Sequence, residues 1–190
     1  MRIFGIDPGS ERTGYGCVQT DGSRHRIVTC GAITVPGTTA FAGRLQIIHR
    51  QLSALLHEHR PDCVALENVF FAANVRSALK LGHARGVAML AAVEAGVPVA
   101  EYTPAEIKRA VVGHGRAEKA QVQHMVKLLL GLPAVPTPHD AADALAVAIC
   151  HVHSYVPGRV AGEQPTRSRA TSWRAYRPAP PPSSLRRAKP

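Results

Sequence analysis

Three strand-like segments come before the first helical pattern, and this order restricts the folds open to the chain. Residues 2–6 form an apolar run that ends at Asp7, and residues 14–19 read as a second strand. Asp21-Gly22 is a hairpin signal and leads into a third strand over residues 26–35. We therefore expect the fold to open with three antiparallel strands.

Helical and strand patterns alternate after these three strands. Apolar residues at helical spacing predict an amphipathic helix up to about His59 that covers a sheet: Leu45, Ile48, Leu52, Leu55 and Leu56. The apolar run 63–66 ends in Glu67 and suits a central strand reached by a helical crossover. The remaining patterns predict helices over 74–95, 104–112, 117–130 and from 138 towards 153, with a fifth strand over 97–100. The chain is thus predicted to be an α/β domain of order β-β-β-α-β-α-β-α.

Two acids lie in the last, alanine-rich helix. Thr137-Pro138 is typical of an N-cap and a first helical position, which places Asp140 and Asp143 in the first two turns and on one face. Such acids can simply interact with the positive end of the helix. However, Asp7 and Glu67 are two further isolated acids, each at the end of an apolar strand. The four together favour a shared carboxylate site.

The basic residues of this 190-residue chain are unevenly distributed. The formal net charge is +10, and the segment from residue 157 onward holds eight Arg or Lys residues against one acid, Glu163. That segment is rich in proline and has little with which to form a core. We therefore expect one domain over residues 1–156 and a disordered basic tail over 157–190. Nucleic acid is a natural partner for such a chain, although basic charge can also serve only solubility or membrane affinity.

The cysteines and the start of the chain indicate a cytoplasmic protein. Cys17, Cys30, Cys63 and Cys150 include no C-x-x-C pair, which predicts free thiols in a reducing compartment. Asp7 interrupts the first apolar run before a secretion signal could form, and no run reaches the ~18 residues that a membrane span needs. We therefore expect a soluble protein without a membrane partner.

Short motifs along the chain follow the order found in one protein family. The matching stretches are Gly5-Ile6-Asp7-Pro8-Gly9-Ser10, Thr13-Gly14-Tyr15-Gly16, Glu67-Asn68-Val69-Phe70, Ser77-Ala78-Leu79-Lys80-Leu81-Gly82, Ala84-Arg85-Gly86, Val111-Val112-Gly113, Ala117-Glu118-Lys119, Gln121-Val122-Gln123-His124-Met125-Val126 and Asp140-Ala141-Ala142-Asp143-Ala144-Leu145-Ala146. With them the sequence resembles the RuvC family of bacterial Holliday-junction resolvases, within the ribonuclease H-like superfamily. The resemblance implies a mixed five-stranded sheet flanked by helices, and it does not reach into the tail.

The resemblance also implies a nuclease that resolves four-way DNA junctions in homologous recombination and DNA repair. The family's four catalytic acids fall on Asp7, Glu67, Asp140 and Asp143, which would bind two Mg²⁺ ions per subunit for phosphodiester hydrolysis. Paired symmetric nicks need two opposed sites, so a homodimer is implied. Its contact helix would be the small-residue segment around 77–86, although such a helix can equally pack close to its own sheet.

Three more residues match family positions that contact DNA. Lys108 and Lys119 correspond to lysines that face the phosphates near the cut, although either could lie on a solvated helix face. Phe70 corresponds to an aromatic residue that stacks on an unpaired base, where a lone Phe is otherwise typical of a core. His139 could ligate a metal in place of Asp140, but adjacent helical residues point about 100° apart, and we expect Asp140 to be the ligand.

Two other classes of function fit part of the sequence. The residues Asp7, Gly9, Thr13 and Gly14 also resemble the phosphate-gripping hairpin of an actin-like or sugar-kinase-like ATPase, but that class needs a second lobe where this chain has a basic tail. A non-catalytic junction-binding module would lack one or more of the four acids, and all are present. The nuclease is therefore favoured, with the branch-migration proteins RuvA and RuvB as implied partners.

Overall fold

The computed structural model describes residues 1–68 and 74–154. Its strands are β1 (Arg2–Asp7), β2 (Arg12–Thr20), β3 (His25–Thr34), β4 (Cys63–Glu67) and β5 (Val99–Tyr102). Its helices are α1 (Phe41–His59), α2 (Val75–Glu94), α3 (Pro104–Val112), α4 (Lys119–Leu129) and α5 (His139–Ser154). Phe70 and the predicted tail lie outside the described residues.

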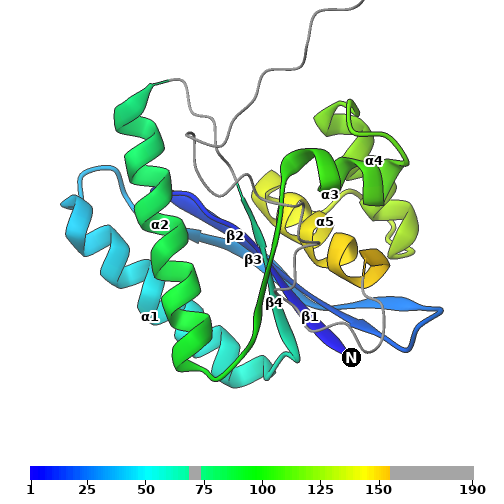
Figure 1. Cartoon of the computed structure of the whole chain (residues 1–190), viewed down its shortest axis with the longest axis horizontal. Helices are drawn as coiled ribbons and strands as arrows, with labels where there is room; N and C mark the ends of the chain where they lie inside the picture. The colour runs from blue at the N-terminus through cyan, green and yellow to red at the C-terminus, as the bar shows by residue number, and fades with distance from the viewer. Residues whose placement is uncertain (69–73, 155–190) are drawn as a thin grey trace, which may run out of the picture.

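The strands form one mixed sheet in the order β3-β2-β1-β4-β5 (Figure 1). β1, β2 and β3 pair antiparallel, whereas β4 pairs parallel with β1 and β5 pairs parallel with β4. Because parallel neighbours need a crossover, β4 and β5 are joined through α2. The predicted five-stranded mixed sheet is confirmed.

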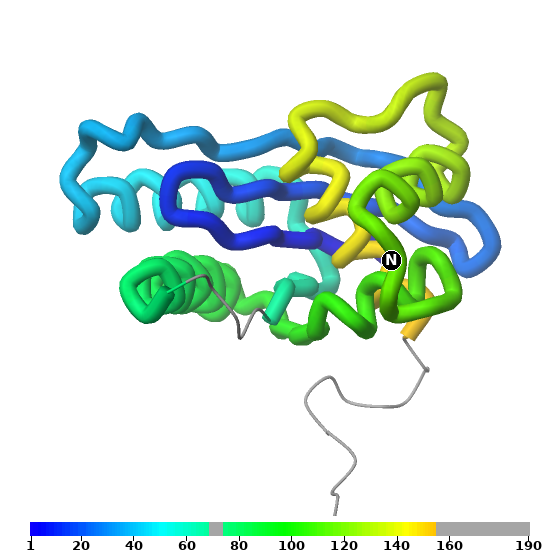
Figure 2. Tube along the Cα trace, turned by 90° about the horizontal axis from the view of Figure 1, so that it is seen from above, coloured from blue at the N-terminus to red at the C-terminus, as the bar shows by residue number. Residues whose placement is uncertain are grey.

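Helices cover both faces of the sheet, with α1 and α2 on one face and α3, α4 and α5 on the other (Figures 1 and 2). Side chains of β1 alternate between the two layers, as the period of a strand requires. Phe4 and Ile6 pack with Leu52 of α1, whereas Ile3 packs in the core that contains Leu145 of α5. Both strand faces are therefore buried, and polar side chains can gather only where the strands end.

Glycines let α5 lie unusually close to the sheet. A Cβ at Gly5 of β1 would overlap the backbone carbonyl oxygen of Ala144, and one at Gly14 of β2 would overlap that of Asp140. Small residues on the helix face complete the fit, since Ala141, Ala144 and Ala148 are fully buried. The position of α5 is thus fixed by backbone contact with β1 and β2.

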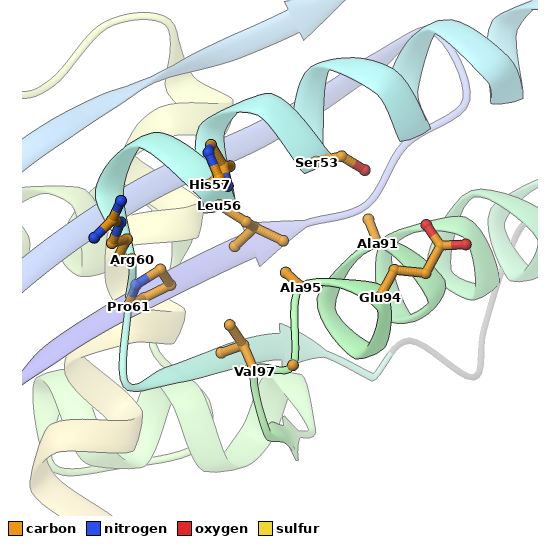
Figure 3. A pocket seen from close by; sticks show the side chains of 10 residues that line it. Ser53, Leu56, His57, Arg60, Pro61, Ala91, Glu94, Ala95 and Val97 are labelled. Atoms are coloured by element: carbon orange, nitrogen blue, oxygen red, sulfur yellow. The ribbon is translucent and has the colours of Figure 1, made fainter.

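A cavity of about 610 Å³ lies between the C-terminal ends of α1 and α2 (Figure 3). His57 and Arg60 border it from the end of α1, and Glu94 borders it from the end of α2. This end of the sheet holds the start of β4, whereas Asp7 and Glu67 stand at the opposite ends of their strands. The cavity is therefore remote from the predicted carboxylate site.

The structure corrects two predicted boundaries. α5 begins at His139, so Pro138 precedes the helix and Thr137 is not its N-cap. The carbonyl oxygen of Pro138 accepts a hydrogen bond from the N–H of Ala141 at 2.9 Å. β5 spans Val99–Tyr102 in place of the predicted 97–100, because the N–H of Val97 bonds back to the end of α2.

Within residues 1–68 and 74–154, no helix is long and apolar enough to cross a membrane.

Candidate active site

Asp7 and Glu67 end two neighbouring parallel strands and point to the same face of the sheet. In the register of the pair, Ile6 lies beside Leu66, so the acids that follow them are neighbours. Ile6 and Leu66 both pack in the core under α1 and α2. Because side chains alternate along a strand, the next residue of each strand faces the opposite layer, which contains α5.

The start of α5 brings the other two acids to this edge. Gly14 lies opposite Asp7 in the β1–β2 pairing, and its missing side chain admits the backbone of Asp140. Asp143 follows one turn later on the same helix. The close packing of α5 on glycine therefore places the start of this helix, with its two acids, at the sheet edge that carries Asp7 and Glu67.

Three of the four acids line a cavity of about 290 Å³ together with both predicted lysines. Asp7, Glu67 and Asp143 contribute the carboxylates, and Lys108 of α3 and Lys119 of α4 contribute the ammonium groups. Apolar walls complete the cavity: Ile107, Val122, Ala146 and Val147, with Pro104. These walls exclude water from one side of the carboxylates and strengthen the interactions between their charges.

The convergence of these acids raises their pKa values. Burial, followed by the charges of Glu67 and Asp143, raises the pKa of Asp7 to about 8, and Asp140 adds the smallest of the effects. At neutral pH Asp7 therefore holds a proton and donates a hydrogen bond to Glu67. Burial also raises the pKa of Glu67, opposed by that hydrogen bond and by the charges of Lys119 and Lys108.

Lys119 forms a close ion pair inside this site. Its Nζ lies 2.6 Å from Oδ2 of Asp143, and the hydrogen bond between them raises the pKa of the lysine. The side chain of Asp143 is 19% exposed, whereas that of Lys119 is 63% exposed. The lysine therefore reaches from solvent to a mostly buried carboxylate.

Asp140 stands apart from the other three acids. It does not border the cavity, and its Oδ2 lies 3.4 Å from Nη1 of Arg12, at the start of β2. The turn before Arg12 is held by Thr13, whose buried hydroxyl donates to the carbonyl oxygen of Gly9 at 2.7 Å. His139 is exposed. No local sequence pattern indicated Arg12, because its contact depends on how α5 crosses β2.

A family model described as crossover junction endodeoxyribonuclease RuvC matches residues 3–151 of this chain. The chain belongs to the RuvC family. RuvC of Trichlorobacter lovleyi is 54% identical over 179 residues, which cover 94% of this chain and 100% of that protein. RuvC of Alkalilimnicola ehrlichii is 57% identical over 152 residues, 80% of this chain and 91% of that protein.

Solved structures of Holliday junction resolvases share this fold. Thermus thermophilus RuvC in complex with a Holliday junction substrate superposes with a TM-score of 0.77 at 39% identity, over 80% of this chain and 93% of that one. The yeast mitochondrial Holliday junction resolvase Ydc2 has a TM-score of 0.58 at 18% identity, over 80% and 77% of the two chains, and shows the common fold alone. The ribonuclease H-like architecture predicted from the sequence is confirmed.

The donor set of the site suits a hard divalent cation, and RuvC enzymes are typically magnesium-dependent. Carboxylate oxygens are the ligands that Mg²⁺ prefers. Burial is the main cause of the raised pKa of Asp7, and the charges of Glu67 and Asp143 add to it; a cation would offset these charges. In residues 1–68 and 74–154, however, no three His, Cys, Asp or Glu side chains stand in a coordinating arrangement. Asp7 is hydrogen-bonded to Glu67, and Asp143 forms an ion pair with Lys119. These carboxylates can therefore coordinate a cation only after they give up their present partners.

Proposed function

We propose that this chain resolves four-way DNA junctions by hydrolysing phosphodiester bonds at the cavity of Asp7, Glu67 and Asp143. The single observation that carries the proposal is the convergence of these acids with two lysines at one sheet edge, in a chain of the RuvC family. The junction bound to the Thermus thermophilus relative supports four-way DNA as the substrate. The process served is homologous recombination and DNA repair in the cytoplasm.

The four acids are the proposed ligands of two Mg²⁺ ions in each subunit. When bound, the ions would supply the Lewis acidity for in-line displacement at phosphorus, leaving a 5′-phosphate and a 3′-hydroxyl. Asp7 and Glu67 would hold them from the strand ends, and Asp140 and Asp143 from α5. Asp7 must first lose its proton, because only a carboxylate without a proton is a good ligand for a hard cation.

Lys108 and Lys119 are proposed to orient the phosphate backbone at the cut. Both border the cavity, and the Nζ of Lys119 is already held 2.6 Å from Asp143. A lysine ammonium group held at this place stabilises the negative charge that develops on the phosphate oxygens during displacement. Phe70, which follows β4 in the sequence, is proposed to stack on an unpaired base.

A homodimer is proposed because paired nicks on opposed strands need two sites related by a two-fold axis. Its contact surface would be α2, where Leu79 is 58% exposed and Leu90 is 50% exposed. RuvA and RuvB are proposed further partners. We also propose that residues 157–190 lie outside the catalytic domain 1–156 and add only sequence-independent affinity for DNA.

The deciding experiment measures nicking of a synthetic four-way junction in Mg²⁺ and junction binding in EDTA. In Asp7→Asn, Glu67→Gln, Asp140→Asn and Asp143→Asn, nicking should fall by orders of magnitude, while binding in EDTA persists or tightens. The matched control is Glu58→Gln, a 70% exposed carboxylate on α1, which should nick like the wild type.

Near wild-type nicking by any of the four variants would remove its residue from the site. If Asp140→Asn retained nicking and His139→Ala lost it, the ligand would be His139. Binding without nicking by the wild-type protein would instead indicate a junction-binding module.

A further inference from the structure

Asp140 has a partner of its own outside the cavity. Its Oδ2 lies 3.4 Å from Nη1 of Arg12, and the two side chains are 27% and 52% exposed. The other acid of α5, Asp143, pairs with Lys119 inside the cavity. Each acid of the helix is thus balanced by a basic side chain, one lying within the carboxylate site and one at its outer edge.

The backbone around Arg12 is firmly held. The hydroxyl of Thr13 bonds to the backbone of Gly9, and the carbonyl oxygen of Glu11 accepts a hydrogen bond from the N–H of Val35 at 2.8 Å. Gly14, two residues along β2, is in backbone contact with Asp140. Arg12 therefore meets Asp140 because two rigid elements cross there, while its half-exposed guanidinium remains open to solvent.

We propose that Arg12 is a positioning residue that acts as a removable counter-ion of Asp140. In the free protein, Arg12 neutralises the charge of Asp140. When the junction binds, a backbone phosphate forms an ion pair with the guanidinium of Arg12, and Asp140 is then free to ligate magnesium. This inference rests on the proposed role of Asp140 as a metal ligand. It goes further by coupling the binding of DNA to the binding of the ion.

Physical chemistry favours this exchange of partners. A half-exposed ion pair contributes at most about 1 kcal/mol, so it is easily broken. A phosphate offers two oxygens to the planar guanidinium and forms the stronger, bidentate interaction. Because coupling between two ligands is reciprocal, junction DNA should tighten magnesium binding and magnesium should tighten the binding of DNA at this edge.

The test compares Arg12→Gln with the wild type by two readouts that need no cleavage. The first is the Mg²⁺ concentration at the midpoint of thermal stabilisation without DNA, and the second is junction affinity in EDTA. The matched control is Arg26→Gln, which removes the same charge from an exposed position of β3. Arg12→Gln should lower the Mg²⁺ midpoint up to about fivefold, since an exposed pair contributes at most about 1 kcal/mol. It should also weaken junction binding more than the control does.

A double variant identifies the residue through which Arg12 acts. In the Asp140→Asn background, Arg12→Gln should leave the Mg²⁺ midpoint unchanged, because the carboxylate for which Arg12 and Mg²⁺ compete has gone. An unchanged midpoint in the single variant, equal effects of the two arginine variants, or additive effects in the double variant would each overturn the role of Arg12. Those results would leave the proposed nuclease intact. A wild-type protein that Mg²⁺ fails to stabilise at any concentration would overturn both proposals.

Discussion

Asp7 is the residue at which the requirements of the fold and of the chemistry conflict. Burial and the charges of Glu67 and Asp143 raise its pKa from 3.8 to about 8. Between these two values the folded protein holds a proton that the unfolded chain has lost, so the free energy of unfolding decreases as pH rises through this window. In the absence of divalent cations the site should therefore weaken the fold most above about pH 8.

Asp7→Asn should remove this pH dependence. The amide has nearly the volume of a protonated carboxyl group and can donate the same hydrogen bond to Glu67, but it does not ionise. In EDTA the variant should match the wild type only below about pH 4, and its advantage in the free energy of unfolding should grow by up to about 4 kcal/mol between pH 5 and pH 9. Thermal melting from pH 5 to pH 9 measures the difference, with Glu58→Gln as the control. A difference that stays constant across this range would mean that the carboxyl of Asp7 titrates normally.

Sequence patterns indicate the acids of the candidate site but not their partners. Asp7 and Glu67 could be found because each ends an apolar strand, and strand ends are the places where a doubly buried sheet exposes polar groups. The contacts of Arg12 with Asp140 and of Lys119 with Asp143 join segments more than twenty residues apart. Such contacts depend on how α5 crosses the sheet, which no local pattern specifies.

At the scale of elements, the position of α5 depends on two glycines of the sheet, Gly5 and Gly14, which have no side chains to hold the helix away. Gly14→Ala would place a methyl group against the backbone carbonyl of Asp140, where no rotamer change can relieve the overlap. The helix must shift, and Asp140 and Asp143 shift with it. We expect a loss of about 1–3 kcal/mol of stability and a further loss of nicking per folded molecule.

The control for this variant is Gly37→Ala, whose added Cβ would lie 3.8 Å from its nearest neighbour, a side-chain oxygen of Glu11. Chemical denaturation and single-turnover nicking should be measured on both proteins. If Gly14→Ala were destabilised but nicked normally once folded, the position of α5 would not control the site.

The far end of α5 is anchored by a buried polar pair. The hydroxyl of Tyr102 and Nδ1 of His151 are 2.9 Å apart, and burial lowers the pKa of the histidine. Because the folded protein resists protonation of His151 more than the unfolded chain does, this group weakens the fold as pH falls below about 6.5.

Tyr102→Phe should cost about 0.5–1.5 kcal/mol at pH 7.5, the usual contribution of one hydrogen bond. Nicking should be unchanged, because neither Tyr102 nor His151 lines the cavity that holds the acids. Urea denaturation and junction cleavage on the same preparation provide the comparison. A variant that lost nicking while keeping its stability would connect this end of α5 to the chemistry.

At the scale of the whole molecule, the order of strands and helices followed from the sequence, while some element ends did not. The apolar stretch from Val97 suggested a strand two residues too early, because the N–H of Val97 is used to finish α2 and Pro98 has no N–H to donate. Likewise, Thr137-Pro138 has the composition of a helix start, yet the chain enters the helix only at His139. Local composition indicated each element, and hydrogen bonds at the helix ends determined where it began.

The surface of α2 is unusually apolar for an outer helix. Val75 is 77% exposed, Leu79 58%, Leu90 50% and Val93 67%. Leu79 and Leu90 border a shallow groove of about 470 Å³ that continues past Gly82 and Gly86, where nothing lies within 4 Å of an added Cβ. Glycines beside exposed leucines allow the backbone of a second helix to approach closely, which supports the proposed dimer.

Leu79→Lys should therefore convert the dimer into a folded monomer. A charge buried in the apolar contact would lose its hydration without gaining a partner, whereas in the monomer the lysine remains in water. The control is Leu128→Lys on α4, because Leu128 is exposed to nearly the same extent, 57%, but on the other layer.

Sedimentation equilibrium reports the mass, and a cruciform plasmid reports whether the cuts are coupled. Wild type and control should give linear plasmid through paired nicks, and Leu79→Lys should give mainly nicked circles at a reduced rate. A monomer that still produced linear plasmid as its first product would separate paired cleavage from dimerisation through α2.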